Sequence, residues 1–157
     1  MARRIILTTK TDEMYLRQIS KPVQVFDDKL HTLLDDMLDT MLDKKGVGLA
    51  APQIGILKRL FIIDSGDGKT VREGDIIEFV NPEILKQSGI NEASEGCLSI
   101  PGESAVVARP KRVSVRAQDR NGEYFTLKTS DDLMCAAICH ELDHLNGVLY
   151  TDKIVKK

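Results

Sequence analysis

The chain has 157 residues, of which 42% are apolar and 29% charged, with a formal net charge of −2. This length suffices for one globular domain with its own core, and we expect residues 1–157 to form a single domain. The nearly balanced charge and the 4% of aromatic residues argue against a nucleic-acid substrate, which selects basic surfaces and stacking side chains.

The amino terminus and the cysteines bear on where the protein works. Met1–Leu7 combine two arginines with a short apolar stretch, and the sequence turns polar at Thr8. This stretch is shorter than the apolar region of a secretory signal, and no apolar run approaches the ~18 residues of a membrane helix. Three cysteines fit a reducing compartment better than a disulfide framework. We therefore expect a cytoplasmic protein without a membrane partner.

The clearest helical pattern runs from Asp28 to about Lys45. Its apolar residues recur at i, i+3, i+4 and i+7, with charged residues on the other face. They are Leu30, Leu33, Leu34, Met37, Leu38, Met41 and Leu42. Asp27 or Asp28 can cap the start, and Gly46 suits the end. The pattern predicts an amphipathic helix near the amino terminus, with His31 as an ordinary surface or boundary residue.

Strand patterns fill the middle of the chain. They are residues 59–64, 75–80, 112–117 and 124–127. Turn-forming residues at 65–68 separate the first two, and Asn121-Gly122 between the last two predicts a hairpin. A second helix is expected from about 131 to 145. This order of elements predicts an α+β fold, with antiparallel or mixed sheets packed around a central C-terminal helix.

The second predicted helix contains an H-E-x-x-H motif at His140–His144. On a helix, residues i and i+4 share a face, with Cβ atoms about 5–6 Å apart. Both imidazoles can then bind one metal ion, while Glu141 flanks the same site as a proton acceptor. A divalent ion lowers the pKa of bound water from 15.7 to ~7. The motif therefore indicates metal-assisted hydrolysis, with Glu141 transferring the proton to the leaving amine.

A catalytic site of this kind usually has a third protein ligand. Tyr150 stands where the longer H-E-x-x-H-x-x-G-x-x-H pattern has its third histidine. The only other histidine, His31, lies far upstream, and Asp152 is the only carboxylate after His144. A plain peptidase pattern is therefore missing its third ligand, and the cysteines are the remaining candidates.

The three cysteines differ in their placement. Cys135 and Cys139 share the predicted helix with the histidines, and Cys139 points about 100° away from its neighbour His140. Cys97 lies elsewhere, in the turn-rich segment 95–102. We therefore predict that Cys97, His140 and His144 bind the metal, with the sulfur as thiolate and water in the fourth position.

Three separated motifs now resemble those of the peptide deformylase family. Residues 46–55, G-V-G-L-A-A-P-Q-I-G, are similar to its first motif, residues 95–99, E-G-C-L-S, to its second, and residues 140–145, H-E-L-D-H-L, to its third. The resemblance implies the family's fold and its reaction. That reaction removes the N-formyl group from the initiator methionine of newly synthesised polypeptides and releases formate.

The resemblance also implies roles for individual residues. The Gln53 side chain and the backbone N–H of Leu98 would stabilise the developing oxyanion together with the metal. The backbone near Val47 and Gly48 would pair with the extended peptide like an added strand. Glu95, next to Gly96 in the second motif, would form an ion pair with Arg109 that braces this motif. We therefore count Val47, Gly48, Glu95 and Gly96 among the substrate-binding residues.

The metal and the substrate side chain follow partly from the same resemblance. The native ion of the family is Fe²⁺, and one thiolate with two imidazoles also suits Zn²⁺, Ni²⁺ or Co²⁺. Ala137, Ala136 and Leu133 lie three, four and seven residues before His140 and share its face. Leu133 and Ala137 would form, together with Val47, a pocket for methionine, which has an unbranched apolar side chain.

Two departures and two alternatives complete the interpretation. Many family members have glutamine where Cys139 stands, which we expect to alter packing only. Only 13 residues follow His144, too few for the C-terminal helix with which some bacterial relatives dock on the ribosome, so ribosome docking is doubtful.

The alternatives are an amidase or peptidase for another acyl group, and a structural metal site, which would need a fourth protein ligand.

Overall fold

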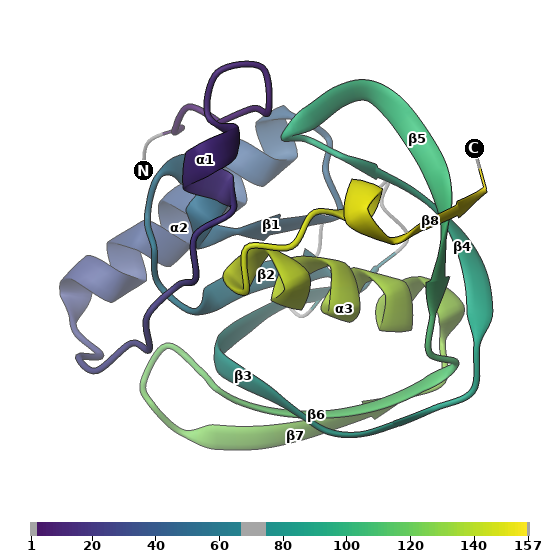
Figure 1. The fold of residues 1–157 in the computed structure, drawn as a ribbon. Coiled ribbons are helices and arrows are strands. Elements are labelled where there is room, and N and C mark those ends of the chain that lie inside the picture. Colours follow the sequence, from purple (N-terminus) through teal and green to yellow (C-terminus); the bar gives the residue numbers. More distant parts are fainter. Residues whose placement is uncertain (1–2, 67–74, 157) are drawn as a thin grey trace.

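The computed structural model describes residues 3–66 and 75–156 (Figure 1). Its α-helices are α1 Glu13–Leu16, α2 Asp28–Asp43 and α3 Asp132–Leu145, and its short 3₁₀ helices are η1 Ala51–Ile54 and η3 Tyr150–Lys153. Its strands are β1 Gly48–Ala50, β2 Leu60–Asp64, β3 Ile76–Ser88, β4 Asn91–Cys97, β5 Ile100–Arg109, β6 Arg112–Gln118, β7 Tyr124–Thr129 and β8 Ile154–Lys156. Within these ranges no helix has both the length and the hydropathy to span a bilayer.

The strands form two antiparallel sheets. One has five strands in the order β1-β2-β3-β6-β7, and the other has three in the order β4-β5-β8. Figure 1 shows α3 in the middle of the molecule, and this helix contacts β1 and β2 of the first sheet as well as β4 and β5 of the second. The fold is therefore α+β, with antiparallel sheets and a C-terminal helix between them.

Both long helices begin with an aspartate cap. The Asp27 carboxylate accepts a hydrogen bond from Leu30 N at 3.1 Å, and the Asp131 carboxylate accepts one from Met134 N at 2.8 Å. Such caps satisfy backbone N–H groups that the first turn of a helix leaves unpaired. Helix α2 ends at Asp43, two residues before its expected end, because Lys45 adopts a positive φ of 56°.

Strand β3 is longer than the sequence pattern predicts. It was expected to end at Val80, but it continues to Ser88 through Pro82. A register shift separates Val80 from Glu83, and Asn81 has a φ of 51°. The bulge lets a proline lie inside the strand without breaking its pairing. The turn expected at residues 65–68 lies partly outside the described residues.

The expected turn-rich segment 95–102 is also different in the structure. Strands β4 and β5 form a hairpin there, with only Leu98 and Ser99 as its turn. Cys97 pairs with Ile100 across this turn. Pro101 and Gly102 suggested an irregular segment, yet they lie within β5. The hairpin holds Cys97 at the end of a strand that packs against α3.

Candidate metal centre and catalytic cleft

Cys97, His140 and His144 come together although they lie in different parts of the chain. One potential ligand atom from each residue lies within 4.8 Å of the other two. Cys97 Sγ and His144 Nε2 are 3.3 Å apart. One sulfur and two imidazole nitrogens are a donor set suited to transition-metal ions. Among the described residues, no further cysteine, histidine or carboxylate joins the cluster.

His140 is oriented by a buried carboxylate. Its Nδ1 lies 2.8 Å from Glu95 Oε1. Because an ionised carboxylate only accepts hydrogen bonds, the neutral ring carries its proton on Nδ1 and keeps Nε2 free as a donor atom for a metal. Burial lowers the pKa of His140, but hydrogen bonds with Cys97 and Glu95 raise it overall.

Glu95 is itself held by Arg109 in the ion pair that the family resemblance implies. Arg109 donates to both Glu95 carboxylate oxygens, at 2.7 and 2.8 Å, and a third hydrogen bond of 2.9 Å reaches Asp143. Burial raises the pKa of Glu95, but the bonds from Arg109 and then His140 outweigh it and set the pKa at about 2. The carboxylate is therefore fully engaged, and only the backbone of Glu95 remains for a substrate.

His144 has a different environment. It is 1% exposed, and its Nδ1 has no hydrogen-bond partner in residues 3–66 and 75–156. Burial, followed by the charges of His140 and Arg109, lowers its pKa to about 3. The ring is therefore neutral at physiological pH, as a metal ligand must be.

Glu141 lies between the histidines with a free carboxylate oxygen. The residue is 5% exposed, and its Oε1 has no partner in the described part of the chain. Burial raises the pKa of this carboxyl group to about 7. A Cβ atom at Gly48 would lie 2.6 Å from Glu141 Oε2. Gly48 therefore makes room for Glu141, a constraint beyond the close substrate approach expected from the sequence.

The Gln53 side chain lies beside the cluster in a fixed orientation. Its Oε1 accepts from Ala50 N at 2.9 Å, and its Nε2 donates to Ser99 Oγ at 3.1 Å. The same Nε2 lies 3.5 Å from Cys97 Sγ. Since Gln53 is 2% exposed, these contacts determine where its N–H groups point.

A cleft of about 1140 Å³ opens over these residues. Every site residue predicted from the sequence lines it except His144, which is buried. Leu133 and Val47 form its rim, with 63% and 45% of their surface exposed, whereas Ala137 is partly buried. The structure thus places the predicted site residues around one cavity.

Three side chains at the site received no firm role from the sequence. Ser99 binds Gln53, Asp143 binds Arg109, and the Tyr150 ring stacks on His140 with centroids 6.0 Å apart. Ser99 and Asp143 lie inside the quoted motifs, but a lone serine or helix aspartate carries no pattern. The sequence singled out Tyr150 only as the residue that replaces the third histidine of the longer H-E-x-x-H-x-x-G-x-x-H pattern.

Comparison with known proteins identifies the family. A model described as polypeptide deformylase matches residues 4–157. Peptide deformylase of Alkaliphilus metalliredigens is 48% identical over 157 residues, covering 100% of both chains. That of Acetivibrio thermocellus is 50% identical over 141 residues, or 90% of this chain and 78% of the relative.

Solved structures agree with this result. The peptide deformylase of Thermotoga maritima has a TM-score of 0.89 at 37% identity, covering 98% of this chain and 99% of that one. The enzyme from Legionella pneumophila has a TM-score of 0.89 at 45% identity, covering 98% and 86%. The chain belongs to the polypeptide deformylase family, hydrolases that remove the N-formyl group from nascent peptides.

Proposed function

We propose that Cys97, His140 and His144 bind one divalent metal ion and that Glu141 moves the proton in deformylation. The observation that carries this proposal is the position of the Glu141 carboxylate, whose Oε1 is buried without a partner in the cleft that Cys97 and His140 also line. The donors fit an ion, because their atoms lie within 4.8 Å of one another and Glu95 already engages the second nitrogen of His140.

The native ion in this proposal is Fe²⁺, with Zn²⁺, Ni²⁺ or Co²⁺ as substitutes. A thiolate with two imidazoles accepts all four ions, and intrinsic affinity favours Zn²⁺ over Fe²⁺. The proposal for iron therefore rests on the family resemblance. Metal analysis of protein purified without oxygen tests it, with iron as the expected majority ion and zinc as the contrary result.

Glu141 accepts a proton from the attacking water and returns it to the leaving nitrogen. When bound, a divalent ion supplies a Lewis acid that makes water acidic enough to react near neutral pH. The pKa of the Glu141 carboxyl is raised to about 7 by burial, and a group with a pKa near the working pH both takes up and releases protons readily. The free Oε1 is the atom available for this exchange.

Gln53 and the backbone N–H of Leu98 stabilise the negative charge that develops on the formyl oxygen. Both residues line the cleft, and Gln53 Nε2 lies beside the Cys97 sulfur at 3.5 Å. Donors positioned before the reaction cost no reorganisation, and loss of one typically raises the barrier by about 2.7–4 kcal/mol.

The peptide binds between the edges of the two sheets. In the described chain, β1 is one edge strand of the first sheet and β4 is one edge strand of the second, and Val47, Gly48, Glu95 and Gly96 all line the cleft. Their backbone groups can pair with an extended peptide. The methionine side chain lies against Val47, Leu133 and Ala137, and unchanged preference for methionine in Ala137→Leu would remove this assignment.

The setting of the reaction completes the proposal. The substrates are N-formyl-methionyl nascent peptides, and we place the protein in the cytoplasm as a single catalytic domain. Ribosome docking forms no part of this proposal. Nucleic acid is not a substrate here.

The test is formate release from an N-formyl-methionyl tripeptide by anaerobically iron-loaded protein. We expect rapid release by the parent and a collapse of kcat in Glu141→Ala with the metal content unchanged. Glu83→Gln, which alters an exposed carboxylate on β3, serves as the control and should keep the parent rate. No release by the metallated parent, or full activity of Glu141→Ala, would contradict the proposal.

A further inference from the structure

The two hydrogens of the Gln53 amide have separate partners. Gln53 Oε1 is occupied by Ala50 N, which fixes the amide orientation and leaves both N–H bonds on the opposite side. One reaches Ser99 Oγ at 3.1 Å, and Cys97 Sγ lies 3.5 Å from the same nitrogen. Since the two hydrogens of an amide are about 120° apart, fixing one of them also directs the other.

Ser99 is placed to fix that first hydrogen. It lies in the two-residue turn between β4 and β5, directly after Leu98, and is 0% exposed. Bulk water therefore does not compete with Gln53 for the Ser99 hydroxyl. The 3.1 Å contact with Ser99 is an ordinary distance for an N–H···O hydrogen bond, and the hydroxyl oxygen has lone pairs to accept it.

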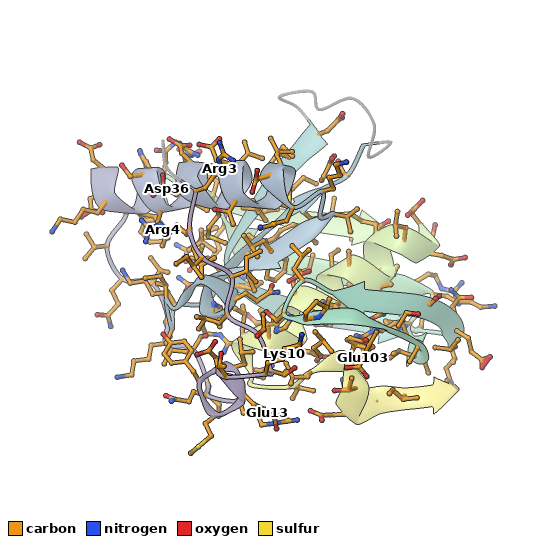
Figure 2. All side chains as sticks on the ribbon, turned by 90° about the horizontal axis from the view of Figure 1, so that it is seen from above. Arg3, Arg4, Lys10, Glu13, Asp36 and Glu103 are labelled. Carbon is orange, nitrogen blue, oxygen red and sulfur yellow. The ribbon has the colours of Figure 1, made fainter. Side chains whose placement is uncertain are left out.

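The backbone around Ser99 and Gln53 is tied together by the amino-terminal segment. Leu7 N donates to Gln53 O at 2.7 Å, and Thr9 N donates to Ser99 O at 2.9 Å. Figure 2 shows this segment running from Arg3 and Arg4, beside Asp36 of α2, toward Lys10. The Arg4 guanidinium donates to Asp36 at 2.8 Å, which anchors the start of the segment.

We propose that Ser99 is a positioning residue for the reaction, acting through Gln53. Its hydroxyl takes one amide hydrogen, so the other points toward Cys97 and the place where the formyl oxygen develops charge. The backbone hydrogen bonds from Leu7 and Thr9 hold Gln53 and Ser99 at a fixed relative position. This inference rests on the role proposed above for Gln53, because without that role there is no donor to position.

A double-mutant cycle tests the inference on the iron-loaded protein, with Ser99→Ala, Gln53→Ala and both together. Loss of an oxyanion donor typically costs 10²–10³-fold in kcat, so we expect a large fall in Gln53→Ala and a partial one, roughly 10-fold, in Ser99→Ala. KM and metal content should stay near parent values. Ser99→Ala should lower kcat no further once Gln53 is absent.

Two further variants guard against a general folding effect. Ser99→Gly also removes the hydroxyl and should show the same fall in kcat. Ser20→Ala is the matched control, because Ser20 is a buried serine whose hydroxyl has no partner among the described residues, and it should keep the parent kcat.

The outcomes separate this inference from the proposed function. If Gln53→Ala is slow while Ser99→Ala keeps the parent kcat, Ser99 does not position Gln53 and the inference is overturned. An equal fall with and without Gln53 would also overturn it, because Ser99 would then act independently. If Gln53→Ala itself keeps the parent kcat, the oxyanion role of Gln53 fails, and the inference fails with it.

Discussion

The two histidines of the motif lie four residues apart on one helix, yet their second ring nitrogens have opposite surroundings. His140 Nδ1 meets Glu95 at 2.8 Å, and Arg109 holds that carboxylate in turn. His144 Nδ1 is buried without a partner in the described chain. One proposed ligand is therefore oriented through its second nitrogen by a charged network, whereas the second nitrogen of the other is surrounded by packing alone.

This difference shows where the site depends on electrostatics. The network joins Glu95 on β4, Arg109 on β5 and Asp143 on α3, so it links the smaller sheet to the helix with the histidines. Arg109 is 3% exposed and Glu95 is 8% exposed. Removing either charge leaves the other buried in a medium that solvates it poorly. Within residues 3–66 and 75–156, no comparable ion pair contacts His144.

The largest expected effect comes from Arg109→Met, which removes the cation from this network. It leaves Glu95 buried without its main partner, and such losses typically destabilise a fold by about 3–5 kcal/mol. We expect a fall of that size in the free energy of unfolding, measured in urea. Arg116→Met, in an exposed pair with Glu83 at 3.6 Å, should cost less than about 1 kcal/mol. Equal losses in both variants would refute the comparison.

The next effect in size concerns metal affinity. Glu95→Gln replaces the charged acceptor of His140 Nδ1 by a neutral amide, and such partners of metal ligands typically contribute 10–100-fold in affinity. We expect weakening of this order in a competition titration with a chelator, whereas Glu83→Gln should leave the affinity unchanged. Parent affinity in Glu95→Gln would show that the carboxylate does not orient the ligand.

Glu95→Gln should also reveal the network through the pH dependence of stability. Glu95 has a pKa of about 2 in the folded chain, against its ordinary value of 4.5. A lowered pKa contributes stability that is fully present above pH 4.5 and is lost as the pH falls toward 2. In metal-free protein, the stability difference between parent and Glu95→Gln should therefore shrink between pH 5 and pH 2. A constant difference across this range would contradict the lowered pKa.

A smaller effect on kcat is expected when Gly48, which makes room for Glu141, gains a side chain. In Gly48→Ala, the new Cβ would lie 2.6 Å from Glu141 Oε2 and so displace the carboxylate that we propose as the proton acceptor. Misplacement by about 1 Å can cost up to 10²-fold, and we expect kcat to fall by roughly 10-fold because a side chain can partly rotate away. Metal content should not change. Parent kcat would show that Glu141 has another productive position.

The smallest effect is expected at the edge of the network. Asp143→Asn keeps an acceptor for Arg109 and loses only the charge, while Glu95 still holds Arg109 through two hydrogen bonds. We expect a loss of about 1 kcal/mol in the free energy of unfolding. A loss as large as that of Arg109→Met would place the centre of the network at Asp143 instead.

Much of the candidate site follows from sequence because two of its three proposed ligands obey local spacing. The four-residue interval in α3 places His140 and His144 on one face, and the lack of another third ligand pointed to Cys97. Strands β2, β6 and β7 and both long helices follow from their periodicity. These features depend on neighbours in the chain, which a single sequence records.

Structural features that depend on contacts between distant parts of the chain could not be predicted from local periodicity and spacing. The hairpin of β4 and β5 contains Pro101 and Gly102, and β3 passes through Pro82, residues that usually mark turns. Register with neighbouring strands overrides those local preferences. Similarly, nothing in the sequence indicates that Ser99 meets Gln53 or that Gly48 faces Glu141, because each contact joins segments more than 40 residues apart.

X-ray absorption spectroscopy of the zinc-loaded protein tests the central claim most directly. If Cys97, His140 and His144 bind the ion, the spectrum should show one sulfur at about 2.3 Å and two imidazole nitrogens at about 2.0–2.1 Å, and Cys97→Ser should lose the sulfur. A parent shell of nitrogen and oxygen only, or a sulfur that persists in Cys97→Ser, would contradict the proposed metal centre.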